Sequence, residues 1–235
     1  RDFLEKPANP PELDGHPGVS LASMGNYIFR ADVLRKVIEE DQEAETKHDI
    51  GGDIIPALVE QEKAYAYDFA HNDIPGQNDR ERGYWRDVGT IDAYYDTSMD
   101  LTAVEPQFDL YNTEWPIFTW GFPRPPAKFV HDADKRRGEA VNSLVCSGAI
   151  ISGGSVQRSI VSPQVRVNSY AEVHDSILFS GVEVGRKAVI KRAIIDKNVK
   201  VPAGAEIGVD LEKDRERFSV TDSGLVIIGK GDSIP

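Results

Sequence analysis

Apolar residues between Leu144 and Ile207 recur with a period of 17 residues, and this period constrains the fold more than any other feature of the chain. The pair Ile150 and Val156, six residues apart, is repeated at Val167 and Val173, at Val184 and Ile190, and at Val201 and Ile207. Three further columns share the period: Leu144, Val161, Leu178 and Ile195; Ile160, Ile177 and Ile194; and Val165, Val182 and Val199. An α-helix, with about 3.6 residues per turn, does not produce this spacing.

A 17-residue period built from six-residue steps predicts about three short strands in each turn of a coil. Each strand would direct one β-branched side chain inward, with Gly, Asn and Ser at the corners. One such coil cannot bury its apolar side alone, so stacked copies are needed to form a continuous core. The alternative is a flat sandwich of short strands, whose spacing is not normally so uniform. We therefore predict a parallel β-helix, whose handedness the period does not fix.

The residues before the repeat predict alternating helices and strands. Helices are indicated at 31–45, where Leu34, Val37 and Ile38 form an apolar stripe, near 54–61, and at 90–101, which Thr90 would cap. Strands are indicated at 1–7, 21–29 and 64–70 and just ahead of Asp87, with polar loops at 7–18, 48–53 and 73–82. This order predicts α/β layers with few strands, as in the second half of such a domain.

The remaining segments complete the predicted organisation. Residues 104–139 hold five prolines among Trp115, Phe118, Trp120 and Phe122, which is typical of an extended connector whose aromatic side chains pack on a neighbour. A charged turn or helix is expected at 210–217, and a closing hairpin at 220–229. We therefore divide the chain into an α/β part (1–103), a connector (104–139) and a β-helix domain (140–235).

The formal net charge of −12 is unevenly distributed. Residues 1–103 contain 10 Lys and Arg against 22 Asp and Glu, whereas the rest of the chain contains 17 of each. A strongly acidic surface argues against a nucleic-acid partner, because phosphate backbones are bound by many Lys and Arg side chains. Any phosphate ligand must therefore be held by local groups.

The lone cysteine, Cys146, excludes an internal disulfide, and its place in the first coil predicts a small buried side chain rather than a nucleophile. No apolar run approaches the roughly 18 residues of a membrane span. The N-terminus shows no signal-peptide pattern. We expect a soluble, cytoplasmic protein without a membrane partner.

Glu5 and Lys6 are adjacent on the first predicted strand, which ends at Pro7. Neighbouring side chains on a strand point to opposite faces, so at most one of them enters the core. A lysine at a strand end can neutralise a phosphate, and a carboxylate can accept hydrogen bonds from sugar hydroxyls. The alternative is a solvated pair at the edge of a strand.

Asp87 lies in the segment Trp85-Arg86-Asp87-Val88-Gly89-Thr90, between a predicted strand and a helix start. Oxygen ligands at strand ends hold Mg²⁺ beside phosphates. Alternatively, Asp87 only stabilises the helix dipole, by roughly 0.3–1 kcal/mol. The spacing does not separate the two. His48 and Asp49 are likewise either loop contacts or ligands.

Six segments resemble those of bacterial ADP-glucose pyrophosphorylases, in order and spacing along the whole chain. They are Phe3-Leu4-Glu5-Lys6-Pro7, Ser23-Met24-Gly25-Asn26-Tyr27, His48-Asp49-Ile50-Gly51-Gly52-Asp53-Ile54-Ile55-Pro56, Trp85-Arg86-Asp87-Val88-Gly89-Thr90, Pro125-Pro126-Ala127-Lys128-Phe129 and Asn142-Ser143-Leu144-Val145. The resemblance implies the C-terminal half of a nucleotidyltransferase domain, followed by a left-handed β-helix. It also implies an allosteric, homotetrameric enzyme of glycogen biosynthesis, which makes ADP-glucose and diphosphate from ATP and glucose 1-phosphate with Mg²⁺.

The same resemblance assigns roles to individual residues. It implies that Lys6 binds the phosphate of glucose 1-phosphate, that Glu5 and Ser23 contact the sugar, and that Asp87 helps to hold the metal. Tyr27 and Asp49 are further candidates for substrate binding. The Gly-rich nucleotide loop of these enzymes is not found in the 235 residues, so we expect the isolated chain to be inactive.

Two other classes of function compete with this interpretation. A non-catalytic regulatory or assembly module is possible because β-helices often form oligomer interfaces. A hexapeptide-repeat acyltransferase would usually place a catalytic His in the coils. The coils contain only His174, with no extended loop beside it, which argues against the acyltransferase.

Basic residues gather in the third and fourth coils. Only Asp196 interrupts the set, which consists of Arg186, Lys187, Lys191, Arg192, Lys197 and Lys200. They are expected to point outward, because Val184, Ile190, Ile194 and Val199 occupy the inward positions. A solvated face is one interpretation; a site for sugar-phosphate or other anionic effectors, formed by Arg186, Lys187 and Arg192, is the other.

Overall fold

The computed structural model describes residues 3–4, 6–133 and 136–234. The chain forms two compact units, Arg1–Asp68 and Phe69–Pro235. Within the described ranges, no helix is long and apolar enough to cross a bilayer. The two units are described separately below.

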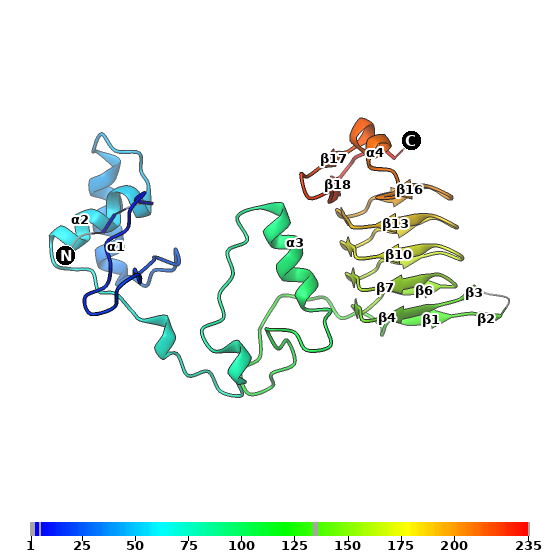
Figure 1. Ribbon diagram of the computed structural model, residues 1–235, viewed down its shortest axis with the longest axis horizontal. Coiled ribbons are helices and arrows are strands. Elements are labelled where there is room, and N and C mark those ends of the chain that lie inside the picture. The colour runs from blue at the N-terminus through cyan, green and yellow to red at the C-terminus, as the bar shows by residue number, and fades with distance from the viewer. Residues whose placement is uncertain (1–2, 5, 134–135, 235) are drawn as a thin grey trace. The chain divides into compact units, whose positions relative to one another are not determined.

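Three parallel sheets form the sides of a stacked coil in the second unit (Figure 1). The first sheet consists of β1 (Lys128–Val130), β6 (Ile150–Ser152), β9 (Arg166–Val167), β12 (Glu183–Val184) and β15 (Lys200–Val201). The second consists of β4 (Glu139–Val141), β7 (Ser155–Gln157), β10 (Glu172–His174), β13 (Val189–Lys191) and β16 (Glu206–Ile207). The third consists of β5 (Leu144–Val145), β8 (Ile160–Val161), β11 (Ile177–Leu178), β14 (Ala193–Ile195) and β18 (Val226–Ile228).

The predicted parallel β-helix is thus confirmed, and its left-handed turn stays a prediction. Strand β1 already pairs with β6, so the coil begins at Lys128, inside the segment expected to be connector. The predicted closing elements are also present. They are helix α4 (Leu211–Arg217) and a hairpin, in which β17 (Ser219–Val220) pairs antiparallel with β18. A small hairpin of β2 (Asp132–Ala133) and β3 (Arg136–Arg137) extends from the first coil.

The first coil is one residue shorter than the others. Val145 pairs with Val161 and Ile151 with Val167, so the inward residues are Val145 and Ile151, not Leu144 and Ile150 as the period predicted. The missing residue is at the Gly153-Gly154 corner. Gly153 has φ +74°, and a Cβ atom on Gly154 would lie 2.8 Å from Val167 Cγ1. Two glycines therefore close the corner in fewer residues than the later coils need.

The interior of the coil is a continuous apolar column, since stacked Val, Ile and Leu side chains from successive turns are fully buried. Buried serines line one corner and join the turns. The Ser176 N–H donates to Ser159 Oγ at 3.1 Å, and the Ala193 N–H donates to Ser176 Oγ at 3.2 Å. Ser176 Oγ itself donates to the His174 carbonyl at 2.6 Å. These hydroxyls satisfy backbone groups that the corner leaves without ladder partners.

Ser176→Ala is expected to lower the free energy of unfolding by about 1–3 kcal/mol, because it leaves the buried Ala193 N–H without its acceptor. Ser219→Ala, at an exposed position on β17, should change it by less than about 0.5 kcal/mol. Urea unfolding of both variants gives the comparison. Equal stabilities would show that the corner hydroxyls are dispensable.

Helix α3 (Ile91–Asp100) packs on the outside of the third sheet. Thr90 caps it as predicted, because its Oγ1 accepts the Ala93 N–H at 3.1 Å. Tyr95 is buried against Ile177, Ile194 and Leu225. The column that includes Ile194 therefore faces α3, and the expected inward position of Ile194 is wrong.

The first unit contains helix α1 (Ala31–Gln42), a π-helical turn η1 (Ile50–Ile54) and helix α2 (Ile55–Glu60). The predicted helices near 31–45 and 54–61 are confirmed, although α1 ends three residues early. Residues 48–53, predicted as a loop, run into the η1 turn. In α1, Leu34 and Val37 are partly buried, while Ile38 is 49% exposed.

The strands predicted ahead of the β-helix are wrong within the described residues. Phe3, Leu4 and residues 21–29 are irregular, the segment 64–70 ends in the 3-10 turn η2 (Phe69–His71), and residues 84–89 ahead of α3 form no strand. The predicted loop 73–82 includes another 3-10 turn, η3 (Asp79–Glu81). A strand needs a hydrogen-bonded neighbour, and in the described part of the chain none pairs with these segments.

Residues 104–127 are extended or turn-like, as predicted for the connector. The four aromatic side chains expected to pack on a neighbour are instead largely exposed, whereas Phe108 stacks on Tyr84 with ring centroids 5.2 Å apart. Trp115, Phe118, Trp120 and Phe122 are each 60% or more exposed. Trp120 and Phe122 contact each other edge to face, with ring centroids 4.6 Å apart.

Candidate functional site

Lys6 is the first candidate residue of the first unit that the structure describes. Lys6 is exposed and has φ +45°, a left-handed conformation that side-chain-bearing residues rarely adopt. It lies in an irregular segment rather than at the end of a strand. Glu5 is outside the described residues.

Ser23 and Tyr27 are brought together by a tight turn. Gly25, at φ +70°, reverses the chain between them, and its N–H donates to Ser23 Oγ at 3.2 Å. The two hydroxyl oxygens lie 2.9 Å apart. Two adjacent hydroxyls of this kind can donate to and accept from the hydroxyls of a sugar.

Asp49 caps the η1 turn. Its Oδ1 accepts the Gly52 N–H at 2.5 Å, and its own N–H donates to Asp53 Oδ2 at 3.0 Å. The neighbouring His48 has its Nδ1 2.8 Å from Asp41 Oδ2. Hydrogen bonds from Thr46 and from His48 hold the pKa of the Asp41 carboxyl below its usual value. The capping bond gives Asp49 a structural role in this loop, and Asp41 is a partner that the sequence did not point to.

Asp87 lies at a hollow of about 360 Å³ in the second unit. Its Oδ1 accepts the Gly89 N–H at 3.0 Å, which holds the carboxylate just ahead of the Thr90 cap. One face of α3 lines the rest of the hollow, together with Tyr84 and Arg86. The α3 residues on this face are Ala93, Asp96, Thr97 and Asp100.

The donor set at this hollow fits a magnesium site in which the protein supplies few ligands. Among the described residues, no three His, Cys, Asp or Glu side chains are grouped closely enough to hold a metal by themselves. Mg²⁺ commonly keeps several waters and is bound by one or two carboxylates plus substrate phosphates. Asp87 matches this arrangement because the described residues engage only its Oδ1.

The basic residues of the third and fourth coils are divided between two corners. Arg186 and Lys187 lie at the corner between β12 and β13, where the Arg186 guanidinium sits 5.5 Å from the centre of the Tyr170 ring. Arg192 lies at the next corner, 5.2 Å from the Tyr95 ring centre, and donates to Ser223 Oγ at 3.1 Å. Arg186 and Lys187 point into solvent as expected, whereas Arg192 is partly buried against α3.

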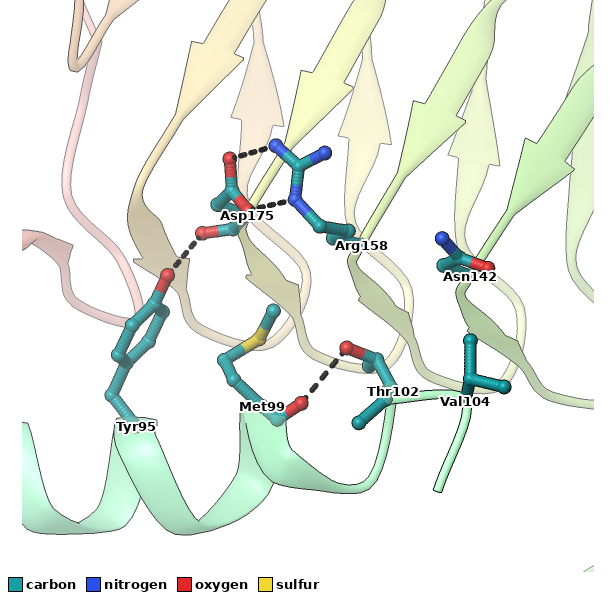
Figure 2. Close-up of a pocket in the computed structure, with 8 residues that line it drawn as sticks. Tyr95, Met99, Thr102, Val104, Asn142, Arg158 and Asp175 are labelled. Carbon is teal, nitrogen blue, oxygen red and sulfur yellow. Dashed lines mark hydrogen bonds and ion pairs between the residues drawn. The ribbon is translucent and has the colours of Figure 1, made fainter. Parts of the chain in front are cut away.

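A second hollow, of about 280 Å³, lies between the end of α3 and the coil corners (Figure 2). Arg158 forms a two-pronged ion pair with Asp175, with N–O distances of 2.7 and 2.8 Å. Tyr95 Oη donates to the Asp175 carbonyl at 2.6 Å, and burial raises the pKa of its phenol. Sequence reasoning missed this hollow. The signal in the sequence was a column of polar residues at the spacing of the coil, and the structure gives each of them a positive φ at a corner: Asn142, Arg158, Asp175 and Arg192.

Cys146 and His174 are the residues that a thiol nucleophile or an acyltransferase in the coils would use. Cys146 is partly buried, and burial raises the pKa of its thiol, as expected for a side chain that packs rather than reacts. His174 lies on β10 with its Nε2 3.6 Å from Glu172 Oε2.

Comparisons with known proteins agree with the order of these elements. The family described as nucleotidyl transferase matches residues 1–104, and the family of GlmU-like C-terminal hexapeptide domains matches residues 125–228. A glucose-1-phosphate adenylyltransferase of Frankia casuarinae is 55% identical over 99% of this chain and 57% of its own length. Proteins of the same name from Parafrankia sp. and Arthrobacter sp. are 52% and 53% identical over 99% of this chain, and over 57% and 50% of their own lengths.

The chain spans a little over half the length of the curated relatives it matches. The matched stretch covers 99% of this chain, so it includes both the part that carries Lys6 and Asp87 and the stacked coil. Both matched families occur in the order that the sequence and the structure display. The chain is therefore similar, along almost its whole length, to 50–57% of the length of these glucose-1-phosphate adenylyltransferases.

Proposed function

We propose that the protein is a cytoplasmic, magnesium-dependent glucose-1-phosphate adenylyltransferase of glycogen biosynthesis. The observation that carries the proposal is the identity of 51–55% to relatives of that name along almost the whole chain. The six segments that resemble the family include each residue to which we assign a catalytic or substrate-binding role, namely Glu5, Lys6, Ser23, Tyr27, Asp49 and Asp87.

The proposed reaction is a displacement at phosphorus. A phosphate oxygen of glucose 1-phosphate attacks the α-phosphorus of ATP in line, and diphosphate leaves. No protein nucleophile is required, so the protein acts by positioning the reactants and by neutralising charge. Lys6 would neutralise the phosphate of glucose 1-phosphate, while the paired hydroxyls of Ser23 and Tyr27 would bind the sugar. Asp87 would hold Mg²⁺, which supplies charge neutralisation at the ATP phosphates.

The proposal is tested by measuring diphosphate release by the full-length gene product that contains these residues. ATP with glucose 1-phosphate and Mg²⁺ should support turnover, and ATP with glucose 6-phosphate should not. The 235-residue chain by itself is expected to be inactive. Absence of glucose 1-phosphate-dependent release by the full-length product would favour a non-catalytic assembly module.

We also propose regulation by sugar phosphates or other anions at the corner that holds Arg186 and Lys187. Both side chains are exposed, and they are adjacent on an otherwise acidic chain. Anionic groups are favoured beside such paired cations. Arg192, which lies near them in the sequence, would then contribute from a separate corner.

Replacing Arg186 and Lys187 with Ala is expected to weaken activation by sugar phosphates, raising the half-maximal concentration about tenfold, with unactivated turnover unchanged. Lys197→Ala and Lys200→Ala, two exposed changes on the same coils, serve as the charge-matched control. If the activation curves of both double variants coincide with that of the parent protein, this corner is a solvated surface.

We propose that the full-length protein assembles as a homotetramer. The exposed aromatic side chains of the connector, such as Trp120 at 80%, offer apolar surface suited to an interface. Sedimentation equilibrium should give four times the chain mass. A monomer at micromolar concentration would contradict the assembly.

A further inference from the structure

Helix α3 presents two different faces, separated by the helical period. Asp92, Tyr95 and Met99 lie at i, i+3 and i+7 on the face that contacts the stacked coil. Ala93, Asp96, Thr97 and Asp100 lie on another face, which lines the hollow that holds Asp87. The same short helix therefore connects the coil to the candidate metal ligand.

The closing hairpin of the coil forms hydrogen bonds with the first turn of α3. Ser223 Oγ donates to Asp92 Oδ1 at 2.6 Å, and Thr221 Oγ1 donates to the same oxygen at 3.0 Å. The two hydroxyls are themselves 3.0 Å apart. Hydrogen bonds to an ionised carboxylate are stronger than bonds between neutral groups, so this contact constrains the helix start more than surface packing would.

Further contacts hold the rest of the same face. Arg192 donates to Ser223 and lies over the Tyr95 ring. Tyr95 Oη donates to the Asp175 carbonyl (Figure 2). Tyr94 stacks on Phe179, with ring centroids 6.5 Å apart and an interplanar angle of 12°. Helix α3 is thus held to the coil at its first turn and at its centre.

Asp87 is linked to the start of α3 by two local hydrogen bonds. The Gly89 N–H binds the Asp87 carboxylate, and Thr90 Oγ1 caps the first turn at Ala93. Asp92 lies in that first turn. Because Gly89 and Thr90 directly precede that turn, we expect a shift of the first turn to move the Asp87 carboxylate.

We propose that Thr221, Ser223 and Asp92 are positioning residues for Asp87, so that the end of the β-helix sets the geometry of the metal ligand. The inference deepens the proposed function and rests on it, because it concerns the Mg²⁺ ligand of that reaction. None of the three side chains needs to touch substrate. Their effect is exerted through the start of α3.

The experiment compares two pairs of substitutions in the full-length protein. Thr221→Val with Ser223→Ala removes both hydroxyls, whereas Thr221→Ser with Ser223→Thr keeps them. The first pair should raise the Mg²⁺ concentration for half-maximal rate and lower kcat, each by at least about threefold, as loss of a supporting contact to a metal ligand does. The KM for glucose 1-phosphate should stay within about twofold, and the second pair should behave as the parent.

Hydrogen exchange provides a readout that does not depend on activity. Amides of residues 84–97 should exchange faster in the variant without hydroxyls, while those of residues 160–190 in the coil should not change. Unchanged exchange at residues 84–97 would show that the hydroxyls of Thr221 and Ser223 do not hold the start of α3. Faster exchange with unaltered Mg²⁺ dependence and kcat would overturn the positioning role. An inactive parent protein would instead refute the proposed function, and the exchange result would still decide whether the hairpin holds α3.

Discussion

Asp87→Asn in the full-length protein is expected to lower kcat by at least about 100-fold. The substitution preserves size and one oxygen but removes the negative charge that a hard cation requires of its ligand. The Gly89 N–H can still bind the remaining oxygen, so the start of α3 should be retained. Steady-state kinetics at saturating Mg²⁺ measures the effect.

The control for Asp87 is a second carboxylate at the same hollow. Asp96→Asn, on α3, changes the local charge equally and should lower kcat by less than about fivefold, the effect of a nearby but non-ligating charge. Calorimetric binding of glucose 1-phosphate without Mg²⁺ should be the same for Asp87→Asn and the parent. Near-normal turnover of Asp87→Asn would show that Asp87 acts only on the helix dipole.

Lys6→Ala is expected to raise the KM for glucose 1-phosphate by about 10- to 100-fold, with a change of less than about threefold in the KM for ATP. This is the size of one lost charge-assisted hydrogen bond to phosphate. The asymmetry follows because Lys6 is assigned to the sugar phosphate and not to the nucleotide. Initial rates with each substrate varied in turn give both constants.

Lys36→Ala is the matched control for Lys6. Lys36 is an exposed lysine on α1 whose Nζ lies 3.5 Å from Glu40, and its removal alters the charge of the first unit by the same amount. It should leave both KM values unchanged. An equal rise in the KM for glucose 1-phosphate and for ATP in Lys6→Ala would contradict the assignment.

The β-helix could be predicted from the sequence because its side chains obey a local rule. Every turn needs inward β-branched residues at fixed steps, so the repeat appears directly in the sequence. The prediction was wrong at the first coil for a local reason as well. The Gly153-Gly154 corner removes one residue, and a strict period of 17 then assigns Leu144 and Ile150 to the inside in place of Val145 and Ile151.

The strands predicted within residues 1–89 are wrong in the described residues, because a strand depends on partners that its own sequence does not specify. Residues 21–29 have an apolar pattern, yet Ile28 is fully exposed and no described strand pairs with the segment. The helices of the same region were predicted correctly. Helix α3 closes its own hydrogen bonds, and Thr90 supplies its cap from the adjacent residue.

The candidate site was only partly visible in the sequence. Ser23 and Tyr27 were named from one segment that resembles the family, and the turn at Gly25 between them brings their hydroxyls together. The hydrogen bonds of Asp92 with Thr221 and Ser223 join residues 129 and 131 positions apart, so no local sequence pattern could predict them. Arg192 lies apart from Arg186 and Lys187 because adjacent corners of a coil face in different directions.

The most direct test of the account follows the phosphorus atoms of ATP. The full-length gene product is incubated with glucose 1-phosphate, Mg²⁺ and ATP labelled with ³²P at either the α or the γ position. Adenylyl transfer predicts that the α label appears in ADP-glucose and the γ label only in diphosphate. Label that stays in ATP, or γ label found in a sugar product, would contradict the proposed function.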